Sequence, residues 1–147
     1  MARPLVVDSS VLIPFFARSK YRRLIHRLIR ERAFRVSSVV CEELFAGSRS
    51  RVERREYREF FSQFRTEDVV TPSHQDWVRA GDLASLYTAR FGELDIHFHE
   101  NDILIVLGAR GVPADILTVN LRHMQTWADF LDKPGQRVLV FPPVSDD

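Results

Sequence analysis

Three carboxylates stand beside apolar segments that lie far apart in the sequence. Asp8 follows the apolar run of residues 5–7, and Asp102 precedes the apolar run of residues 103–107. Glu43 interrupts an otherwise apolar helical stripe. Carboxylates are costly to bury unless they are paired or bound to a metal ion. If folding brings the three together, they form an anionic pocket of oxygen ligands, the kind of pocket that holds Mg²⁺ or Mn²⁺.

Two of these carboxylates also have a purely structural interpretation. Asp8 opens an Asp-Ser-Ser sequence, and both residue types cap the N-termini of helices. Asp102 falls in the expected first turn of a helix, where a negative charge compensates the helix dipole. Taken singly, neither residue separates a cap from a metal ligand, so the prediction depends on all three occurring together.

Glu43 is the sharper case because of its helical position. The apolar residues of the stripe are Val39, Val40 and Leu44, and position 43 falls on the same face of a helix. The neighbouring Glu42 is turned away by about 100°. The alternative is that Glu43 lies at the edge of the stripe and forms an ion pair with one of the many arginines.

The net charge of +1 conceals two halves of opposite sign. Residues 1–65 contain 15 Arg and Lys against 7 Asp and Glu, whereas residues 66–147 contain 6 against 13. A basic half indicates a polyanionic partner, and an acidic half indicates a metal ion or a basic partner. The alternative is an ordinary solvated surface. The arginines that we expect to contact the polyanion, which would be RNA under the resemblance described below, are Arg22, Arg23, Arg27 and Arg30.

The bulk composition predicts one cytoplasmic domain. A chain of 147 residues that is 45% apolar suits a single core, here residues 1–141 followed by a tail, 142–147. The single cysteine, Cys41, rules out an internal disulfide and favours a reducing compartment. There is no basic-then-apolar leader and no apolar run near the ~20 residues of a membrane span, so no membrane association is expected.

Apolar runs alternate with helical patterns along the chain. The expected strands are residues 5–7, 34–37, 67–71, 116–119 and 137–141. The expected helices begin with a turn near Pro14 and continue as residues 20–33, 38–47, 50–65, 73–91, 102–110 and 121–132. This alternation predicts an α/β fold with a parallel or mostly parallel sheet of four to five strands, flanked by helices.

A loop is expected at residues 93–99, just before an N-cap at Asn101. It contains His97 and His99, near Asp95. Together these could form a transition-metal site, but such sites need more ligands at defined spacing. The simpler interpretation is a pair of loop residues, either of which can still contact substrate beside the acidic pocket.

Four segments together resemble the motifs of PIN-domain nucleases, in particular the VapC-type toxins of type II toxin–antitoxin systems. They are residues 7–12 (VDSSVL), 38–47 (SVVCEELFAG), 101–105 (NDILI) with Ala109, and 117–120 (LTVN). Each motif is degenerate alone, but the order, the spacing and the total length all match, and the resemblance covers nearly the whole chain.

The resemblance implies a PIN-like fold and a metal-dependent ribonuclease that acts on RNA, with tRNA and rRNA as the candidate substrates. It implies that Asp8, Glu43 and Asp102 hold Mg²⁺ or Mn²⁺ and carry the catalysis, supported by Ser10 and Thr118. It also implies a small antitoxin partner and a homodimer.

One position departs from the family pattern. The family often has a further acidic residue just after the fourth strand, where this chain has Asn120. Asn120 offers an oxygen without charge, and His123 binds some metals but suits Mg²⁺ poorly. Asp115 is expected at the opposite end of the strand. The alternative function is therefore a catalytically weakened or inactive RNA-binding or regulatory module with the same fold.

Overall fold

Five parallel strands form a single sheet in the computed structural model, which describes residues 3–131 and 136–146. The strand order is β3-β2-β1-β4-β5, and all four pairings are parallel. The strands are β1 (Leu5–Val7), β2 (Phe34–Ser37), β3 (Val69–Val70), β4 (Asp115–Leu117) and β5 (Val140–Phe141). The predicted α/β class and parallel sheet are confirmed.

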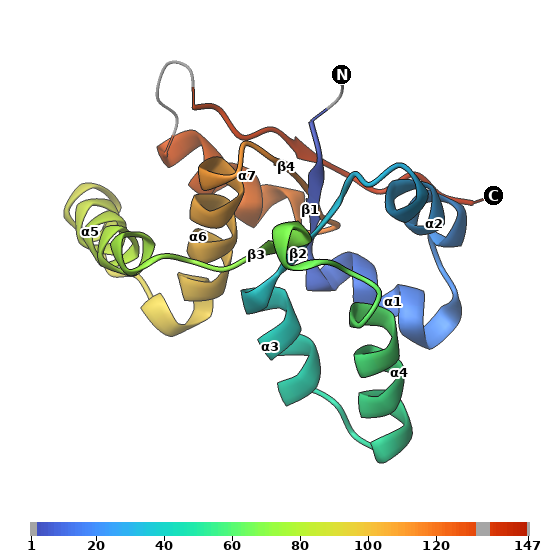
Figure 1. Ribbon diagram of the computed structural model, residues 1–147. Coiled ribbons are helices and arrows are strands. Elements are labelled where there is room, and N and C mark those ends of the chain that lie inside the picture. The colour runs from blue at the N-terminus through green and yellow to red at the C-terminus, as the bar shows by residue number, and fades with distance from the viewer. Residues whose placement is uncertain (1–2, 132–135, 147) are drawn as a thin grey trace.

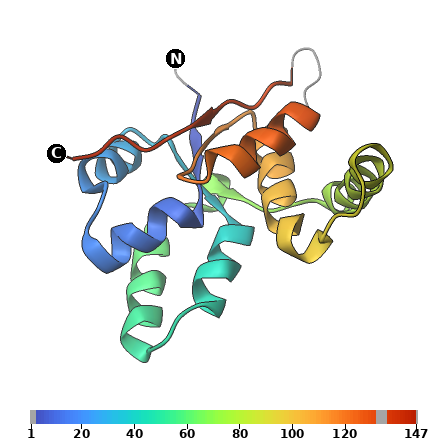
Figure 2. The same ribbon diagram turned by 180° about the vertical axis from the view of Figure 1, so that it is seen from behind.

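Helices cover both faces of this sheet (Figures 1 and 2). They are α1 (Ser9–Arg18), α2 (Arg22–Arg30), α3 (Ser38–Ala46), α4 (Arg51–Phe61), α5 (His74–Phe91), α6 (Ile96–Gly111) and α7 (Leu121–Phe130). Helices α1, α2 and α4 lie to one side of β1, and α5, α6 and α7 lie to the other. Helix α3 contacts both α1 and α6, so it joins the two layers beyond the end of β2.

The strand order reverses direction between β1 and β4. The chain leaves β1 toward β2 and β3 on one side, and later crosses back to β4 and β5 on the other. In sheets of this kind, ligands bind outside the carboxyl ends of the strands at the point where the direction reverses. Asp8 directly follows β1 and Thr118 directly follows β4.

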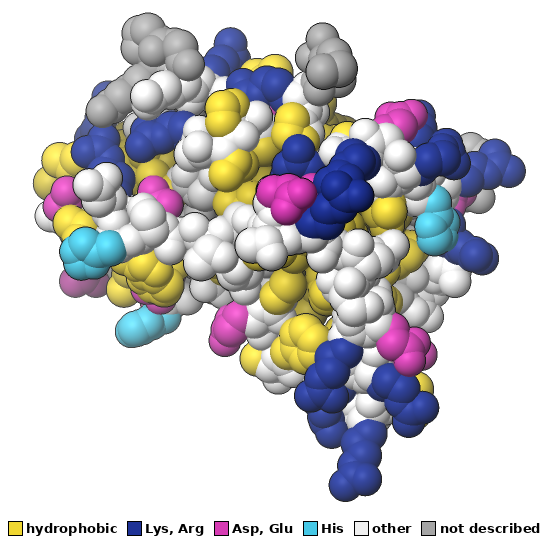
Figure 3. Space-filling view, viewed as in Figure 1, with side chains coloured by type: hydrophobic (Ala, Val, Ile, Leu, Met, Phe, Trp, Pro, Cys, Tyr) yellow, Lys and Arg dark blue, Asp and Glu magenta, His cyan; other side chains and the backbone are white. Residues whose placement is uncertain are grey.

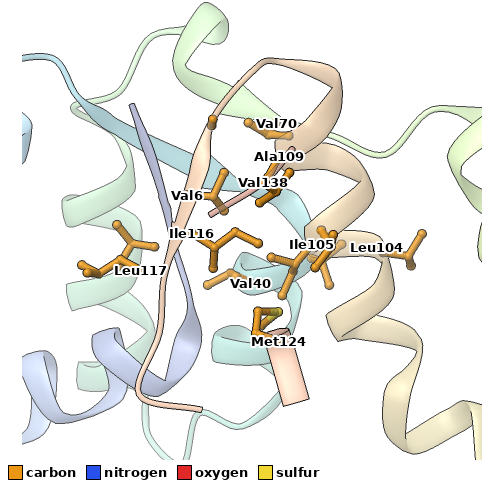
Figure 4. Packing of buried hydrophobic residues seen from close by; sticks show 14 of the residues in the cluster. Val6, Val40, Val70, Leu104, Ile105, Ala109, Ile116, Leu117, Met124 and Val138 are labelled. Atoms are coloured by element: carbon orange, nitrogen blue, oxygen red, sulfur yellow. The ribbon is translucent and has the colours of Figure 1, made fainter. Parts of the chain in front are cut away.

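The core is built from apolar residues of the sheet and of the helices on its two faces (Figure 4). Ile116 points toward Ile105 of α6 and Val40 of α3, and Leu117 points to the other side of the sheet. This alternation along β4 is the period of two that a strand imposes. The fully buried Met124 brings α7 into the same cluster. This packing fixes the positions of α3, α6 and α7 relative to the sheet.

Helix α6 begins earlier than predicted. Residues 96–99 were expected in a loop with an N-cap at Asn101, but α6 begins at Ile96 and Asn101 lies within it. The ring of His99 lies 5.6 Å from that of Trp127 and 5.6 Å from that of His123. These tertiary contacts hold an additional turn that the helix propensity of the segment does not predict.

Other expected boundaries shift by a few residues. The expected strand 67–71 is shorter because residues Thr66–Asp68 form a 3-10 turn in which Asp68 accepts a hydrogen bond from the backbone N–H of Arg65 at 3.1 Å. The expected helices 20–33 and 50–65 are shorter at both ends, and residue 132 of the last expected helix lies outside the described residues. Helix α3 has the expected extent, with Gly47 at its C-cap.

The residues after β5 run along α2 (Figure 1). Asp146 accepts a hydrogen bond from the backbone N–H of Arg23 at 3.1 Å. Helix α2 has no acidic residue in its first turn and no side-chain cap of its own. The segment after β5 therefore supplies a negative charge where the helix dipole favours one.

Candidate metal centre

Asp8 is held in place by two hydroxyl groups. Its side chain is only 4% exposed, and its Oδ2 accepts hydrogen bonds from Ser10 Oγ at 2.7 Å and Thr118 Oγ1 at 2.8 Å. Although Asp8 occupies the N-cap position of α1, its side chain makes no capping hydrogen bond. The capping interpretation is therefore wrong, and the carboxylate faces the loop after β4 instead.

The same two hydroxyls fasten the loop between β4 and α7. Ser10 Oγ accepts from the backbone N–H of Val119 at 3.0 Å, and Thr118 Oγ1 accepts from that of Asn120 at 2.9 Å. A hydroxyl has one proton, so with both donating to Asp8 the 3.1 Å approach between Ser10 and Thr118 carries no hydrogen bond of its own. Ser10 and Thr118 thus link the ends of β1 and β4 through Asp8.

Glu43 reaches the site from α3, on the face that the sequence predicted. Its side chain is half-buried, whereas that of Glu42 is exposed. Burial raises the pKa of Glu43 to about 7, with further contributions from the charges of Asp8 and Asp102, and a hydrogen bond from Asn101 opposes the rise. Its Oε1 is buried without a hydrogen-bond partner. No ion pair joins Glu43 to an arginine among the described residues, so that alternative is wrong.

Asp102 reaches the site from α6. Burial raises its pKa to about 6, and the charge of Asp8 adds to the rise while His123 lowers it. Because α6 begins at Ile96, Asp102 lies in the second turn and not in the first. Compensation of the helix dipole, which is confined to the first turn, therefore does not explain its position.

The three predicted carboxylates thus form one electrostatic group. Asp8 raises the pKa of both Glu43 and Asp102, although the three residues come from separate elements. Within the described residues, no three His, Cys, Asp or Glu side chains are already spaced as ligands of one ion. The orphaned Oε1 of Glu43 and the oxygen-only donor set fit a hard divalent cation, toward which the side chains would have to turn inward.

Comparison with solved structures finds the same fold in several complexes. VapBC2 from Rickettsia felis, bound to a DNA fragment from its promoter, aligns at TM-score 0.66 and 14% identity over 94% of this chain and 97% of that chain. DNA-bound VapBC from Salmonella typhimurium aligns at TM-score 0.67 and 15% identity over 98% and 100%. VapBC-1 from nontypeable Haemophilus influenzae aligns at TM-score 0.64 and 16% identity over 94% and 96%.

The chain has a PIN-like fold. At these identities the likeness establishes the fold alone, over nearly the full length of each partner of the alignment. No family model and no curated protein sequence matches the chain. The fold implied by the four motifs is confirmed.

The PIN-like site includes three further neighbours of the carboxylates. Asn101, which the sequence interpretation treated only as a helix cap, lowers the pKa of Glu43 through a hydrogen bond. His123, which the sequence interpretation weighed for the place of the missing fourth acid, acts electrostatically on Asp102. Asn120, the other candidate for that place, lies beside this histidine, with its Nδ2 3.3 Å from His123 Nδ1. The contact between α6 and α7 brings His123 to Asp102.

Asp115 lies where the sequence predicted it, away from the three carboxylates. Asp115 stands at the start of β4, where its Oδ1 lies 3.7 Å from Arg3 Nε and accepts from the backbone N–H of Leu139. It is thus at the end of the strand away from the site, as expected.

His99 lies within α6 beside His123, and burial and His123 lower its pKa. The transition-metal cluster that these residues could have formed is absent among the described residues, in agreement with the simpler interpretation, although His97 and His99 lie in a helix and not in a loop.

The arginines predicted to bind RNA lie on α2. Arg22, Arg23, Arg27 and Arg30 line a groove of about 930 Å³ together with the segment after β5. They form no ion pair with described residues. Figure 3 shows Lys and Arg side chains gathered over the edge that carries α2 and over the tip of the hairpin of α3 and α4. Basic surface is therefore found in two places, on α2 and at the tip of the α3–α4 hairpin.

No helix of the described residues is both long and apolar enough to cross a membrane.

Proposed function

We propose that this protein is a divalent-metal-dependent endoribonuclease and the toxin of a toxin–antitoxin pair. The observation that carries the proposal is the mutual electrostatic influence of Asp8, Glu43 and Asp102 at the switch point of a PIN-like sheet. Burying acidic groups beside one another without a cation is unfavourable: burial first, and the charges of the neighbouring carboxylates second, raise the pKa values of Glu43 and Asp102. A site that concentrates carboxylates at this cost is suited to Mg²⁺ or Mn²⁺.

The chain's own residues would divide the work of phosphodiester hydrolysis. Asp8, Glu43 and Asp102 would hold the cation, which when bound supplies neutralisation of the phosphate charge and activation of water. Ser10 and Thr118 would keep Asp8 correctly oriented by donating hydrogen bonds to its Oδ2. The basic surface over α2 would attract the RNA backbone in a salt-dependent manner.

Asn120 favours a second candidate, a PIN-like RNA-binding module with weak or no cleavage. Its backbone N–H is bonded to Thr118 and its side chain lies near His123, so it brings no negative charge to the site. With one carboxylate fewer, the site binds a second cation more weakly. The proposed nuclease would then depend on a single ion, or on Mn²⁺ more than on Mg²⁺.

The proposed partners are a small antitoxin and a second copy of the chain. The structural neighbours are VapBC complexes, and this supports an antitoxin as the partner. Purification of the protein from its native cells, with mass spectrometry of any short protein that co-purifies and light scattering of the purified material, tests both partners. A chain that elutes alone and monomeric at all concentrations would contradict the homodimer.

The deciding experiment is cleavage of a structured RNA pool that includes tRNA and rRNA. The antitoxin-free protein is incubated with EDTA, Mg²⁺ or Mn²⁺, beside the Asp8→Asn and Asp102→Asn variants and the control Asp115→Asn. We expect metal-dependent cleavage that both site variants lose and the control keeps. If the folded protein binds RNA but cuts under no condition, the RNA-binding module is the correct function and the nuclease is not.

A further inference from the structure

Phe98 is an exposed aromatic residue one helical turn from a carboxylate of the site. It is 64% exposed, although large apolar side chains are normally buried. It precedes Asp102 by four residues on α6, and residues at this spacing share one face of a helix. The ring of Phe98 therefore lies on the same face of α6 as Asp102 and outside the core.

Two imidazoles support the ring of Phe98 edge-on. Its centroid lies 4.9 Å from that of His99, with an interplanar angle of 85°, and 5.6 Å from that of His123, at 77°. His99 lies in turn 5.6 Å from Trp127, which is buried. This chain of edge contacts connects Phe98 to the core and leaves most of the ring in solvent.

We propose that Phe98 is the stacking platform for an unpaired base next to the scissile phosphate. The inference rests on the proposed ribonuclease function and names a residue that positions its substrate. Sequence-tolerant recognition of single strands uses exposed aromatic rings beside a cationic surface. A base in a continuous duplex has no free face to offer to such a ring.

The groups around Phe98 favour a nucleotide over a second copy of the chain. His123 lies beside the ring, and the amide of Asn120 lies within 3.3 Å of its Nδ1. These groups can bond to the edge of a base or to a ribose hydroxyl. Under an apolar protein surface they would lose their hydrogen bonds to water without replacement, which costs free energy.

The test uses a single-stranded RNA oligonucleotide that carries the fluorescent base 2-aminopurine at one position at a time. Fluorescence is quenched when this base stacks on an aromatic ring. Titrations are run in EDTA, and again with Ca²⁺, so that binding is measured without efficient cleavage. The variants are Phe98→Ala, Phe98→Leu and Phe98→Trp, and the matched control is Phe91→Ala. Phe91 is 60% exposed and packs against Tyr87 and Phe130, at the other end of α7 from His123.

We expect quenching at one position of the oligonucleotide, its loss in Phe98→Ala and Phe98→Leu, and its retention in Phe98→Trp. Loss of one base stack should weaken binding roughly 5- to 150-fold. In cleavage assays the loss should appear mainly in KM for single-stranded RNA, and the control variant should behave as the parent protein.

Unchanged quenching and unchanged KM in Phe98→Ala, with cleavage intact, would overturn this inference and leave the ribonuclease standing. A change of oligomeric state in Phe98→Ala would overturn it in favour of an interface between two copies. The absence of any RNA binding or cleavage by the parent protein would instead overturn the proposed function.

Discussion

Glu43 is the residue at which burial and function are most directly opposed. Its carboxylate has an unpartnered buried oxygen and two acidic neighbours, Asp8 and Asp102. In the metal-free protein its ionisation is therefore unfavourable, and its pKa is raised from 4.5 to about 7. A folded state that binds a proton more tightly than the unfolded chain is stabilised at low pH and loses that stabilisation as pH rises through 7.

The Glu43→Gln variant should be more stable than the parent at pH 8 when no metal is present. The two proteins should converge below pH 4.5, where Glu43 is protonated in both the folded and the unfolded parent. Because the side chain is half-exposed, we expect a difference at pH 8 on the order of 1 kcal/mol. Urea unfolding in EDTA between about pH 4 and 8 measures it, with the exposed Glu42→Gln as control. A parent protein whose stability advantage over the variant grows with pH would contradict this account.

Thr118 is the residue that holds Asp8 from the opposite strand. Its side chain is fully buried and donates to Asp8 Oδ2 at 2.8 Å. Thr118→Val keeps the side-chain volume but removes both the donor to Asp8 and the acceptor for the backbone N–H of Asn120. We expect a loss of about 1–3 kcal/mol in the free energy of unfolding and roughly 10- to 100-fold weaker Mn²⁺ binding. Calorimetric titration with Mn²⁺ checks the second effect, which a purely structural threonine would not produce.

The helices that carry the carboxylates were predictable to different degrees. The start of α3 follows from Ser37, whose Oγ accepts from the backbone N–H of Val39 and Val40, and Glu43 could be placed on its inner face from the 3.6-residue period alone. The start of α6 could not be predicted from the sequence, because it depends on the contact of His99 with Trp127, a residue of another helix. Local patterns predict what one element does alone, and tertiary contacts extend it beyond that prediction.

The two serine caps allow the role of α3 to be tested at the level of the helix. Ser37 caps α3 from a buried position, and Ser50 caps α4 by accepting from the backbone N–H of Glu53 at 3.1 Å. Loss of an N-cap side chain typically costs ~1 kcal/mol. We expect Ser37→Ala to lower both stability and Mn²⁺ affinity, since α3 presents Glu43, and Ser50→Ala to lower stability alone. Equal metal affinity in the two variants would argue against a positioning role for α3.

Across the whole molecule, the carboxylate site draws on both halves of the sequence, since Asp8 and Glu43 belong to the basic half and Asp102 to the acidic half. Asp8 follows β1, where the strand order reverses, and the predicted RNA-binding arginines lie on α2, beside the segment after β5. The sequence predicted the sign of each half, but the position of the groove depends on where the last residues of the chain lie.

The contribution of α2 to RNA binding can be measured through salt dependence. Arg27→Gln combined with Arg30→Gln should reduce the slope of log affinity against log salt by about 1.4, since each lost phosphate contact on a single strand contributes ~0.7. Fluorescence anisotropy from 50 to 300 mM KCl gives the slope. The comparison variant is Arg55→Gln combined with Arg58→Gln on α4. If only the α4 pair alters the slope, the RNA path runs along the hairpin of α3 and α4.

The central position of β1 also bears on how the protein is made. β1 pairs with β2 on one side and with β4 on the other, so residues from the start of the chain must wait for residues 115–117 before the middle of the sheet is complete. Contacts between such distant segments form late and slow the folding of a domain. Asp8 therefore meets Thr118 only when most of the polypeptide has left the ribosome. A nascent chain that stops before β4 would carry all three carboxylates and still lack the hydroxyl of Thr118 that holds Asp8 in place.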